Sequence, residues 1–332
     1  MTRIAVQPGD QEFDCTEGDT ILRAALRAGI GMPYSCNVGS CGNCRFELIE
    51  GAVEHLRHDP PAWSERDLKR NRWLGCQALP KRACTIKFRA DDGYVGKYRP
   101  ARRNAELLSA TPVTRDITEF SFRIDGADDF LPGQYALLSA PGIEGGRPYS
   151  MSNLPGDGTW QFQIKLVPGG AATGYLFDRA GPGAGILLDG PYGTAYLRTD
   201  SPRDIVLMAG GSGLSPMVSI ARGAQAAGML GSRKLHFFYG CRTAADLFDE
   251  SILGDELRAT SVVTPVLSEP ASGAAWTGKT GFLHDVVGQA LGGNLKDHEI
   301  YFAGPAVMSA AVQKMAFEAG VPMDQLHFDE FY

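Results

Sequence analysis

Four cysteines in the first quarter of the chain have the spacing of a metal-cluster site. Cys36, Cys41 and Cys44 lie in one short loop, and Cys76 follows far downstream. Thiolates in this C-x4-C-x2-C…C arrangement are a ligand set for a 2Fe–2S cluster, and the small residues between them let main-chain N–H groups approach the sulfurs. A structural zinc site, the alternative, usually takes its ligands as pairs from both ends, whereas here a triplet faces a single cysteine. The spacing therefore predicts a 2Fe–2S cluster.

Short strands and a helix are expected to position these cysteines. Residues 3–15 alternate like a strand hairpin, and a helix is predicted over residues 20–28, followed by a glycine that ends it. Together with the cysteine loop, these elements predict a compact β-grasp domain over residues 1–91. The run 33–44, completed by Cys76, resembles the plant-type ferredoxins.

The middle of the chain is typical of an antiparallel barrel. Residues 92–103 are basic and have no apolar period, so we predict an inter-domain linker there. Beyond it, residues 118–124 and 160–166 alternate strictly between apolar and polar side chains. Half-buried strands of this kind, separated by Gly/Pro turns, favour a β-barrel, which we assign to residues 104–200.

The segment Arg147-Pro148-Tyr149-Ser150 lies within the predicted barrel. It resembles the R-x-Y-S motif of the ferredoxin–NADP reductase superfamily, in which the barrel holds a flavin. The resemblance implies that Arg147 pairs with the flavin pyrophosphate, with Pro148 beside it. Tyr149 is then expected to stack on the isoalloxazine, and the Ser150 hydroxyl to lie near flavin N5, where hydride arrives.

A second glycine-rich segment also resembles the flavin site of that superfamily. A turn here runs into a helix whose free N–H groups could receive a pyrophosphate. Two pyrophosphate-type elements favour FAD over FMN. The residues expected to contact the cofactor from this segment are Lys165, Val167, Gly169, Gly170, Ala172 and Thr173.

The last third of the chain, residues 201–332, is predicted to be a doubly wound parallel α/β domain. Strand-like runs at residues 204–209, 235–242 and 299–305 alternate with helical stretches. The glycine turn after the first run departs from the strict G-x-G-x-x-G fingerprint, so on its own it is weak evidence for a dinucleotide site. The residues expected to approach the nicotinamide coenzyme are Gly211, Ser212, Gly213, Gly304 and Pro305.

The coenzyme is expected to be NADH rather than NADPH, because the three-domain reductases that this chain resembles mostly use NADH. Asp246 could accept a hydrogen bond from a ribose 2′-OH, whereas Arg242 could meet a 2′-phosphate. Superfamily members often carry a cysteine near the nicotinamide. This chain has Ala303 at that position, so no thiol can act there. Phe331 is expected either to lie near the flavin until nicotinamide displaces it, or to be a packed terminal aromatic.

The resemblance covers the whole chain: a multidomain α+β and α/β protein with a ferredoxin, a flavin barrel and a nucleotide domain. It implies the reductase component of a bacterial multicomponent oxygenase, of the toluene and phenol diiron monooxygenase type. The partner would be the hydroxylase component or an intermediary Rieske ferredoxin. Two alternatives stay open: the reductase of a Rieske-type ring-hydroxylating dioxygenase, and a redox sensor. The hydrocarbon that the oxygenase attacks is not predicted.

Composition excludes several other classes. The net charge is −6, without the basic excess of a nucleic-acid binder, and no apolar run is long enough to cross a bilayer. Cys15, Cys84 and Cys241 are expected to be buried free thiols, which favours a reducing cytoplasm. A monomer is expected, because electron-transfer contacts with partners are small.

Overall fold

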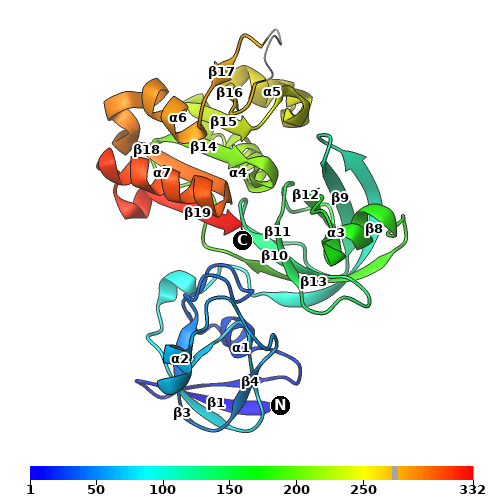
Figure 1. The fold of residues 1–332 in the computed structure, drawn as a ribbon, viewed down its shortest axis with the longest axis vertical. Helices are drawn as coiled ribbons and strands as arrows, with labels where there is room; N and C mark the ends of the chain where they lie inside the picture. The colour runs from blue at the N-terminus through cyan, green and yellow to red at the C-terminus, as the bar shows by residue number, and fades with distance from the viewer. Residues whose placement is uncertain (271–275, 332) are drawn as a thin grey trace.

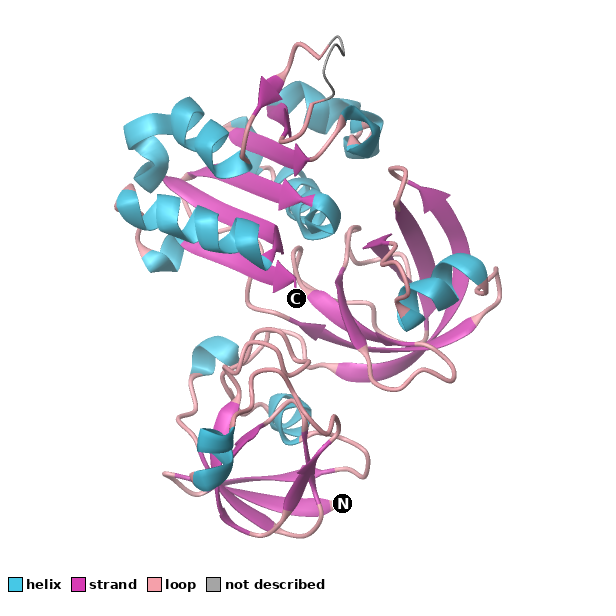
Figure 2. Cartoon of the chain, in the orientation of Figure 1, coloured by secondary structure: helices cyan, strands magenta, loops and turns pink. Residues whose placement is uncertain are grey.

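The computed structural model describes residues 1–270 and 276–331. Three bodies follow one another along the chain, each built on its own main sheet, as Figures 1 and 2 show. The last strand, β19 (Leu326–Phe331), ends where the three bodies meet. The predicted architecture of a β-grasp unit, an antiparallel barrel and a doubly wound sheet is confirmed.

The N-terminal body is a five-stranded sheet in the order β2-β1-β7-β3-β5, with a helix packed on it. That helix, α1 (Ile21–Ala28), is capped by Thr20 and ends at Gly29, whose φ of 82° suits a residue without a side chain. Its apolar face is buried in the core, because Ile21, Leu22 and Leu26 recur on one side. The other elements are β1 (Thr2–Gln7), β2 (Gln11–Cys15), β3 (Arg45–Glu50), β4 (Val53–His55), α2 (Glu65–Lys69), β5 (Arg72–Leu74), β6 (Ala78–Pro80), β7 (Cys84–Lys87) and η1 (Asp92–Tyr94).

The middle body is a six-stranded antiparallel sheet in the order β11-β10-β13-β8-β9-β12. A bridge between Met151 and Phe162 joins its two outer strands and closes it into a barrel. Alternate residues of β9 point inward, so that Phe120 and Phe122 fill the interior with Trp160. The elements are β8 (Ala101–Pro112), β9 (Ile117–Ile124), β10 (Tyr135–Ser139), β11 (Arg147–Ser150), β12 (Thr159–Lys165), α3 (Ala171–Asp178) and β13 (Gly185–Tyr192).

The C-terminal body is a six-stranded parallel sheet in the order β17-β16-β15-β14-β18-β19. Helices cover both faces: α4 and α5 bury their apolar residues against one side, and α6 and α7 against the other. The central strands are mostly apolar, as expected of strands that are buried on both faces. The elements besides β19 are β14 (Asp204–Gly210), η2 (Gly211–Gly213), α4 (Leu214–Ala226), η3 (Met229–Gly231), β15 (Leu235–Cys241), η4 (Ala244–Asp246), η5 (Glu250–Leu253), α5 (Asp255–Thr260), β16 (Ser261–Leu267), β17 (Lys279–Thr280), α6 (Leu283–Leu291), η6 (Gly292–Asp297), β18 (His298–Pro305), α7 (Ala306–Glu318) and η7 (Met323–Gln325).

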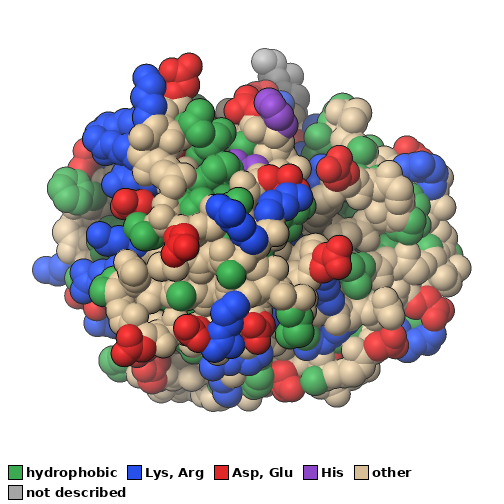
Figure 3. All heavy atoms as spheres, turned by 90° about the horizontal axis from the view of Figure 1, so that it is seen from below, with side chains coloured by type: hydrophobic (Ala, Val, Ile, Leu, Met, Phe, Trp, Pro, Cys, Tyr) green, Lys and Arg blue, Asp and Glu red, His purple; other side chains and the backbone are tan. Residues whose placement is uncertain are grey.

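The stretch predicted as a linker, residues 92–103, contains η1 and the first three residues of β8. Within residues 1–270 and 276–331, no helix has the length and hydrophobicity needed to span a bilayer. On the face seen from below in Figure 3, Lys and Arg side chains are interspersed with Asp and Glu, and this view shows no broad patch of one sign among the described side chains.

Candidate functional site

The four predicted ligand cysteines form two interacting pairs: three of them come from the loop between α1 and β3, and Cys76 comes from the turn between β5 and β6. The Cys41 thiol hydrogen-bonds to Cys36, and the Cys76 thiol to Cys44. The Cys36 charge also acts on Cys44 and Cys76, so the two pairs are neighbours. Among the described residues, no group of three or more His, Cys, Asp or Glu side chains is placed to hold a single metal ion. Two pairs suit a binuclear cluster better than a mononuclear zinc site.

Main-chain N–H groups surround the sulfur of Cys36. The N–H groups of Val38, Ser40 and Cys41 lie 3.5, 3.3 and 3.3 Å from it. The hydrogen bond from Cys41, followed by these N–H groups, lowers the pKa of Cys36 to about 5 despite its burial. A thiol that ionises this easily is prepared to be a metal ligand, because the thiolate is the ligand form.

Glycines shape this loop, and helix α1 supports it. Gly39 and Gly42 have φ values of 86° and 79°, which residues with side chains rarely adopt. Arg23 of α1 donates to the side-chain and main-chain oxygens of Asn37, which also has a positive φ. Cys36, Cys44 and Cys76 are buried, whereas Cys41 is partly exposed, so the loop opens to solvent at Cys41.

Strand β11 carries the first predicted flavin segment. Arg147 is exposed, and its guanidinium donates to loop carbonyls, among them that of Gly145. Pro148 and Tyr149 are partly buried, and burial raises the pKa of the Tyr149 hydroxyl to about 12. Ser150 is buried. Among the described residues, the hydrogen bonds of the Arg147 guanidinium go to the main-chain carbonyls of residues 144–146, so its fork can take an anionic ligand.

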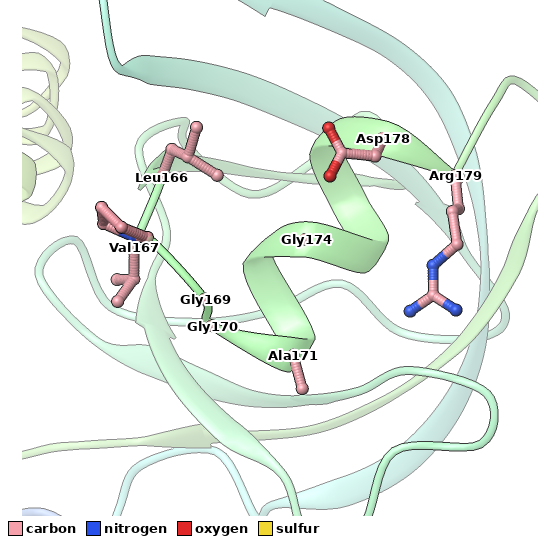
Figure 4. A pocket seen from close by; sticks show the side chains of 9 residues that line it. Leu166, Val167, Gly169, Gly170, Ala171, Gly174, Asp178 and Arg179 are labelled. Carbon is pink, nitrogen blue, oxygen red and sulfur yellow. The ribbon is translucent and has the colours of Figure 1, made fainter.

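The second predicted flavin segment joins β12 to α3 (Figure 4). The turn and the helix line an open hollow of about 510 Å³. The α3 N-terminus at Gly170 has no side-chain cap, so its first N–H groups are available. Buried Thr173 holds the turn through its hydroxyl, which contacts the N–H and carbonyl of Val167. Gly169, Gly170 and Ala171 line the hollow, and Ala172 is buried behind them.

The glycine turn after β14 packs tightly on the end of β18. A side chain at Gly213 would collide with the main-chain carbonyl of Ala303. A side chain at Gly304 would first meet the Met308 side chain at 2.7 Å, and its Cβ atom would lie 3.2 Å from the main chain of Gly210. Strand β19 adds Phe331 opposite Pro305 in the parallel ladder. The residues predicted for the nicotinamide site therefore lie together at the carboxyl end of the sheet, where doubly wound sheets bind ligands.

Two of the predicted cofactor residues have partners of their own. Lys165, at the end of β12, forms a 2.6 Å ion pair with Asp116 and lies beside Gly211. Asp246 closes a capping box with Thr243, and Arg115 of the barrel forms a 2.6 Å ion pair with its other oxygen. Arg242 is exposed, and its Nε atom lies 4.0 Å from the Glu269 carboxylate.

Four residues at this site were missed by the sequence reasoning, and two of them, Ser215 and Gln163, contact each other. Ser215, in the first turn of α4, bridges β11 and β12: its hydroxyl donates to the Ser150 carbonyl at 2.6 Å and accepts from the Gln163 N–H at 3.2 Å. The buried side-chain oxygen of Gln163 has no hydrogen-bond partner within the described part of the chain, as a group awaiting a ligand would.

The third missed residue is Tyr135, which lies directly opposite Ser150 in the β10–β11 ladder. The fourth is Asp329 of β19, a partly exposed residue whose carboxyl is closely surrounded. Desolvation raises the pKa of Asp329 to about 7, and its charge acts on Tyr34 and Tyr135. Tyr135 ends the run Pro132-Gly133-Gln134-Tyr135 and Asp329 lies in the acidic–aromatic tail, two segments that resemble the superfamily, but neither resemblance assigned a role to these side chains.

Comparisons with known families account for most of the chain. Residues 4–81 match the 2Fe-2S iron-sulfur cluster binding domain. Residues 104–196 match the oxidoreductase FAD-binding domain, and residues 207–314 the oxidoreductase NAD-binding domain. The three cofactors predicted from the sequence are confirmed at this level, without a distinction between NADH and NADPH.

Relatives resemble this chain along its whole length. The ferredoxin–NAD(P)(+) reductase CarAd of Metapseudomonas resinovorans is 39% identical over 332 residues, covering 98% of each chain. The ferredoxin–NAD(+) reductase component of the alkene monooxygenase system of Xanthobacter autotrophicus is 39% identical over 327 residues, covering 97% of this chain and 98% of the relative.

A solved structure shows the same arrangement of domains. The ferredoxin reductase in carbazole 1,9a-dioxygenase superposes with a TM-score of 0.92 at 36% identity, covering 100% of this chain and 98% of that one. The residues described above, these matches and this superposition together establish that the chain belongs to the ferredoxin–NAD(P)+ reductases with 2Fe–2S, FAD and NAD domains that serve as reductase components of oxygenase systems.

Proposed function

We propose that this chain is the NADH-dependent reductase of a diiron aromatic or alkene monooxygenase system. Electrons would pass from NADH through FAD and the 2Fe–2S cluster to the hydroxylase component. The observation that carries this order is a contact between two domains: the Tyr135 hydroxyl of β10 donates to the carbonyl of Ser35 at 2.6 Å. Ser35 precedes Cys36, and Tyr135 faces Ser150 in β11.

The chain itself supplies position and electrostatics. When bound, the flavin accepts a hydride from nicotinamide and releases single electrons, which the cluster carries onward. Cys36 and Cys41 would hold one iron, and Cys44 and Cys76 the other, as the pairing of their thiols suggests. The N–H groups around the Cys36 sulfur would stabilise the negative charge that the cluster gains on reduction.

The flavin site would combine strand β11 with the β12–α3 turn. The planar fork of Arg147 suits a pyrophosphate, and so do the uncapped N–H groups at the start of α3. Tyr149 would stack on the flavin ring and Ser150 would direct its hydroxyl toward N5. The buried, unpartnered oxygen of Gln163 supports a polar ligand nearby, because Ser215 links Gln163 to Ser150.

The nicotinamide coenzyme would enter between the β14 turn and the end of β18. Gly211, with a φ of 56°, and Gly213 let the backbone approach it closely. Phe331, opposite Pro305, would cover the flavin until nicotinamide replaces it. Asp246 would select NADH by repelling a 2′-phosphate, with Arg242 as the opposing, phosphate-binding candidate.

The electron acceptor is proposed to be a hydroxylase component, and the dioxygenase alternative predicts a Rieske ferredoxin instead. The alkene monooxygenase reductase of Xanthobacter autotrophicus, 39% identical, supports the first choice. None of the seven cysteines, all of which lie in the described part of the chain, forms a disulfide, which supports a reducing cytoplasm. A monomer that meets its partner through a small contact completes the proposal.

An anaerobic NADH titration tests the proposed electron path. Visible absorbance should show flavin bleaching, and low-temperature EPR should show the signal of a reduced 2Fe–2S cluster. Bleaching without that signal would remove the cluster from the path, and no bleaching with NADH but bleaching with NADPH would overturn the coenzyme choice. Purified hydroxylase and Rieske ferredoxin, added separately to the reduced protein, would then identify the acceptor by the one that reoxidises the cluster.

A further inference from the structure

Two tyrosine hydroxyls tie the iron–sulfur domain to the flavin barrel. Tyr135 of β10 donates to the Ser35 carbonyl at 2.6 Å, and the Tyr34 hydroxyl accepts from the Gly193 N–H at 2.8 Å. Tyr34 and Tyr135 are both buried, and their rings each lie about 6 Å from that of Tyr192 in β13. The two bonds are made by Tyr34 and Ser35, the two residues that directly precede Cys36. They therefore hold the cysteine loop itself and not a remote part of the domain.

An ion-pair network crosses the same boundary. Arg27, at the end of α1, donates both Nη atoms to the carboxylate of Asp189 in β13, at 2.9 and 2.8 Å. Its Nε atom donates to Asp19 at 2.9 Å, and Arg102 of β8 donates to the other Asp19 oxygen at 3.2 Å. Tyr192 donates to Asp189 as well. Two arginines and two aspartates thus neutralise one another, with two charges from each domain.

The two carboxylates of this network are buried, although Arg102 is exposed, and this distinguishes the network from ordinary surface pairs. Asp19 and Asp189 are 2% and 5% exposed. Burial would raise the pKa of Asp189, but the hydrogen bonds and charge of Arg27 hold it below its usual range. Separation of the domains would strip Asp189 of its bidentate partner and expose an apolar surface, because Tyr135, Leu137 and Tyr192 of the barrel belong to the core of the iron–sulfur domain.

We propose that the iron–sulfur domain stays docked on strands β10 and β13 throughout turnover, held by two positioning elements: the Arg27–Asp189 pair and the Tyr135 hydroxyl. Figure 1 shows this domain directly beneath those strands. The inference rests on the proposed electron path and adds its geometry: electrons reach the cluster without domain movement and leave from the Cys41 side, which is open to solvent. The acceptor must therefore come to the docked reductase.

The first test measures docking without turnover. Amide hydrogen exchange by mass spectrometry follows peptides that contain residues 34–38 and 189–193 in the full-length protein. Asp189→Asn should speed exchange in both peptides about ten-fold, because the loss of a charge-assisted bidentate contact shifts the docking equilibrium by that order. Glu106→Gln is the matched control, since it breaks the exposed Arg123–Glu106 pair of the same sheet and should leave both peptides unchanged.

The second test separates docking from folding. In single-turnover stopped flow with NADH, Asp189→Asn should leave flavin reduction unchanged and slow the following cluster reduction. Tyr135→Phe keeps the ring and should slow cluster reduction about ten-fold relative to flavin reduction, because small displacements of reacting groups have large effects on rate. The EPR line shape should match the unaltered protein, which shows that the cluster is intact.

Two results would overturn the inference. One is exchange in the unaltered protein as fast as in Asp189→Asn, which would mean that the domains already separate freely. The other is cluster reduction at the normal rate in both variants. Failure of the proposed electron path would look different, because the unaltered protein itself would show no cluster signal after its flavin is reduced.

Discussion

The hydroxyl of Ser215 lies 2.6 Å from the main-chain carbonyl of Ser150 and donates a hydrogen bond to it. The contact joins the first turn of α4, in the nucleotide domain, to the strand that carries the flavin motif. Ser219 and Arg222, one and two turns farther along α4, donate to the carbonyls of Asn153 and Ser152. One face of α4 therefore sets the position of β11 relative to the coenzyme site.

Ser215→Ala should lower the free energy of unfolding by about 1–3 kcal/mol, since two buried main-chain groups lose their partner. Denaturant titration measures this change. Ser219→Ala is the control, because it removes a comparable 2.8 Å bond farther from Ser150. Both variants should be destabilised, but Ser215→Ala alone should slow flavin reduction by NADH. Equal rates in the two variants would limit Ser215 to a packing role.

Cys41→Ser should abolish the 2Fe–2S EPR signal, because one thiolate of the proposed ligand set is lost, while NADH still bleaches the flavin. Iron and sulfide content give an independent measure. Cys84→Ser serves as the control, since Cys84 is a buried thiol of the same domain that contacts carbonyl oxygens. Normal electron delivery to a one-electron protein acceptor in Cys41→Ser would contradict the proposed path.

Arg147→Ala should weaken FAD retention about ten-fold or more, because a charge-assisted, bidentate contact with the pyrophosphate is lost. Flavin content after gel filtration and titration of the apoprotein with FAD measure this effect. Arg123→Ala, which removes an exposed barrel arginine paired with Glu106, should leave retention unchanged. Unaltered binding in Arg147→Ala would exclude its role at the pyrophosphate.

Asp246→Ala should narrow the preference for NADH over NADPH, measured as the ratio of kcat/KM values. The same substitution opens the capping box with Thr243 and frees Arg115, so some stability is lost as well. Thr243→Val separates the two effects: it removes the capping hydroxyl and keeps the carboxylate. A coenzyme ratio that shifts equally in both variants would assign the effect to the cap.

Asp329→Asn should stabilise the protein at high pH more than at low pH. Burial raises the folded-state pKa of Asp329 to about 7, above its ordinary value of 3.8. The folded protein thus binds this proton more tightly than the unfolded chain, so stability falls as pH rises from about 4 to about 7. The asparagine side chain does not ionise, so the variant does not undergo this loss of stability as the pH rises. The melting temperatures of the unaltered protein and of Asp329→Asn at pH 4.5 and pH 8 test this prediction. A difference between the two proteins that is the same at both pH values would rule out a raised pKa of Asp329.

Features that depend on local pattern were predictable from the sequence. The spacing of the four cysteines, the alternation of β9 and β12 and the apolar run of β14 indicated the cluster site and the two larger domains. Each rests on residues close together in the chain, where periodicity and turn chemistry act directly. The fold, the three cofactors and the family are confirmed, while the individual site residues stay predictions.

Contacts between distant segments could not be predicted in this way. Tyr135 and Ser35 are separated by 100 positions, and their hydrogen bond depends on how two finished domains meet. Ser215 looked like part of a glycine-rich turn, although its hydroxyl acts on another domain. The spacing Thr243-x-x-Asp246 is that of a capping box, so one partner of Asp246 is a local one. Its other partner, Arg115, comes from the barrel, and that contact depends on how the two domains pack.

The shared core between the first domain and strands β10 and β13 restricts how such reductases can be recombined. A chimera that transplants residues 1–91 alone would place a foreign surface against Tyr135, Leu137 and Tyr192 and leave Asp189 without its arginine. The exchangeable module is therefore larger than the first domain. A hybrid that carries the matching faces of both strands along with it keeps the apolar contact and the charge balance, and engineers of hybrid oxygenase systems should place the crossover accordingly.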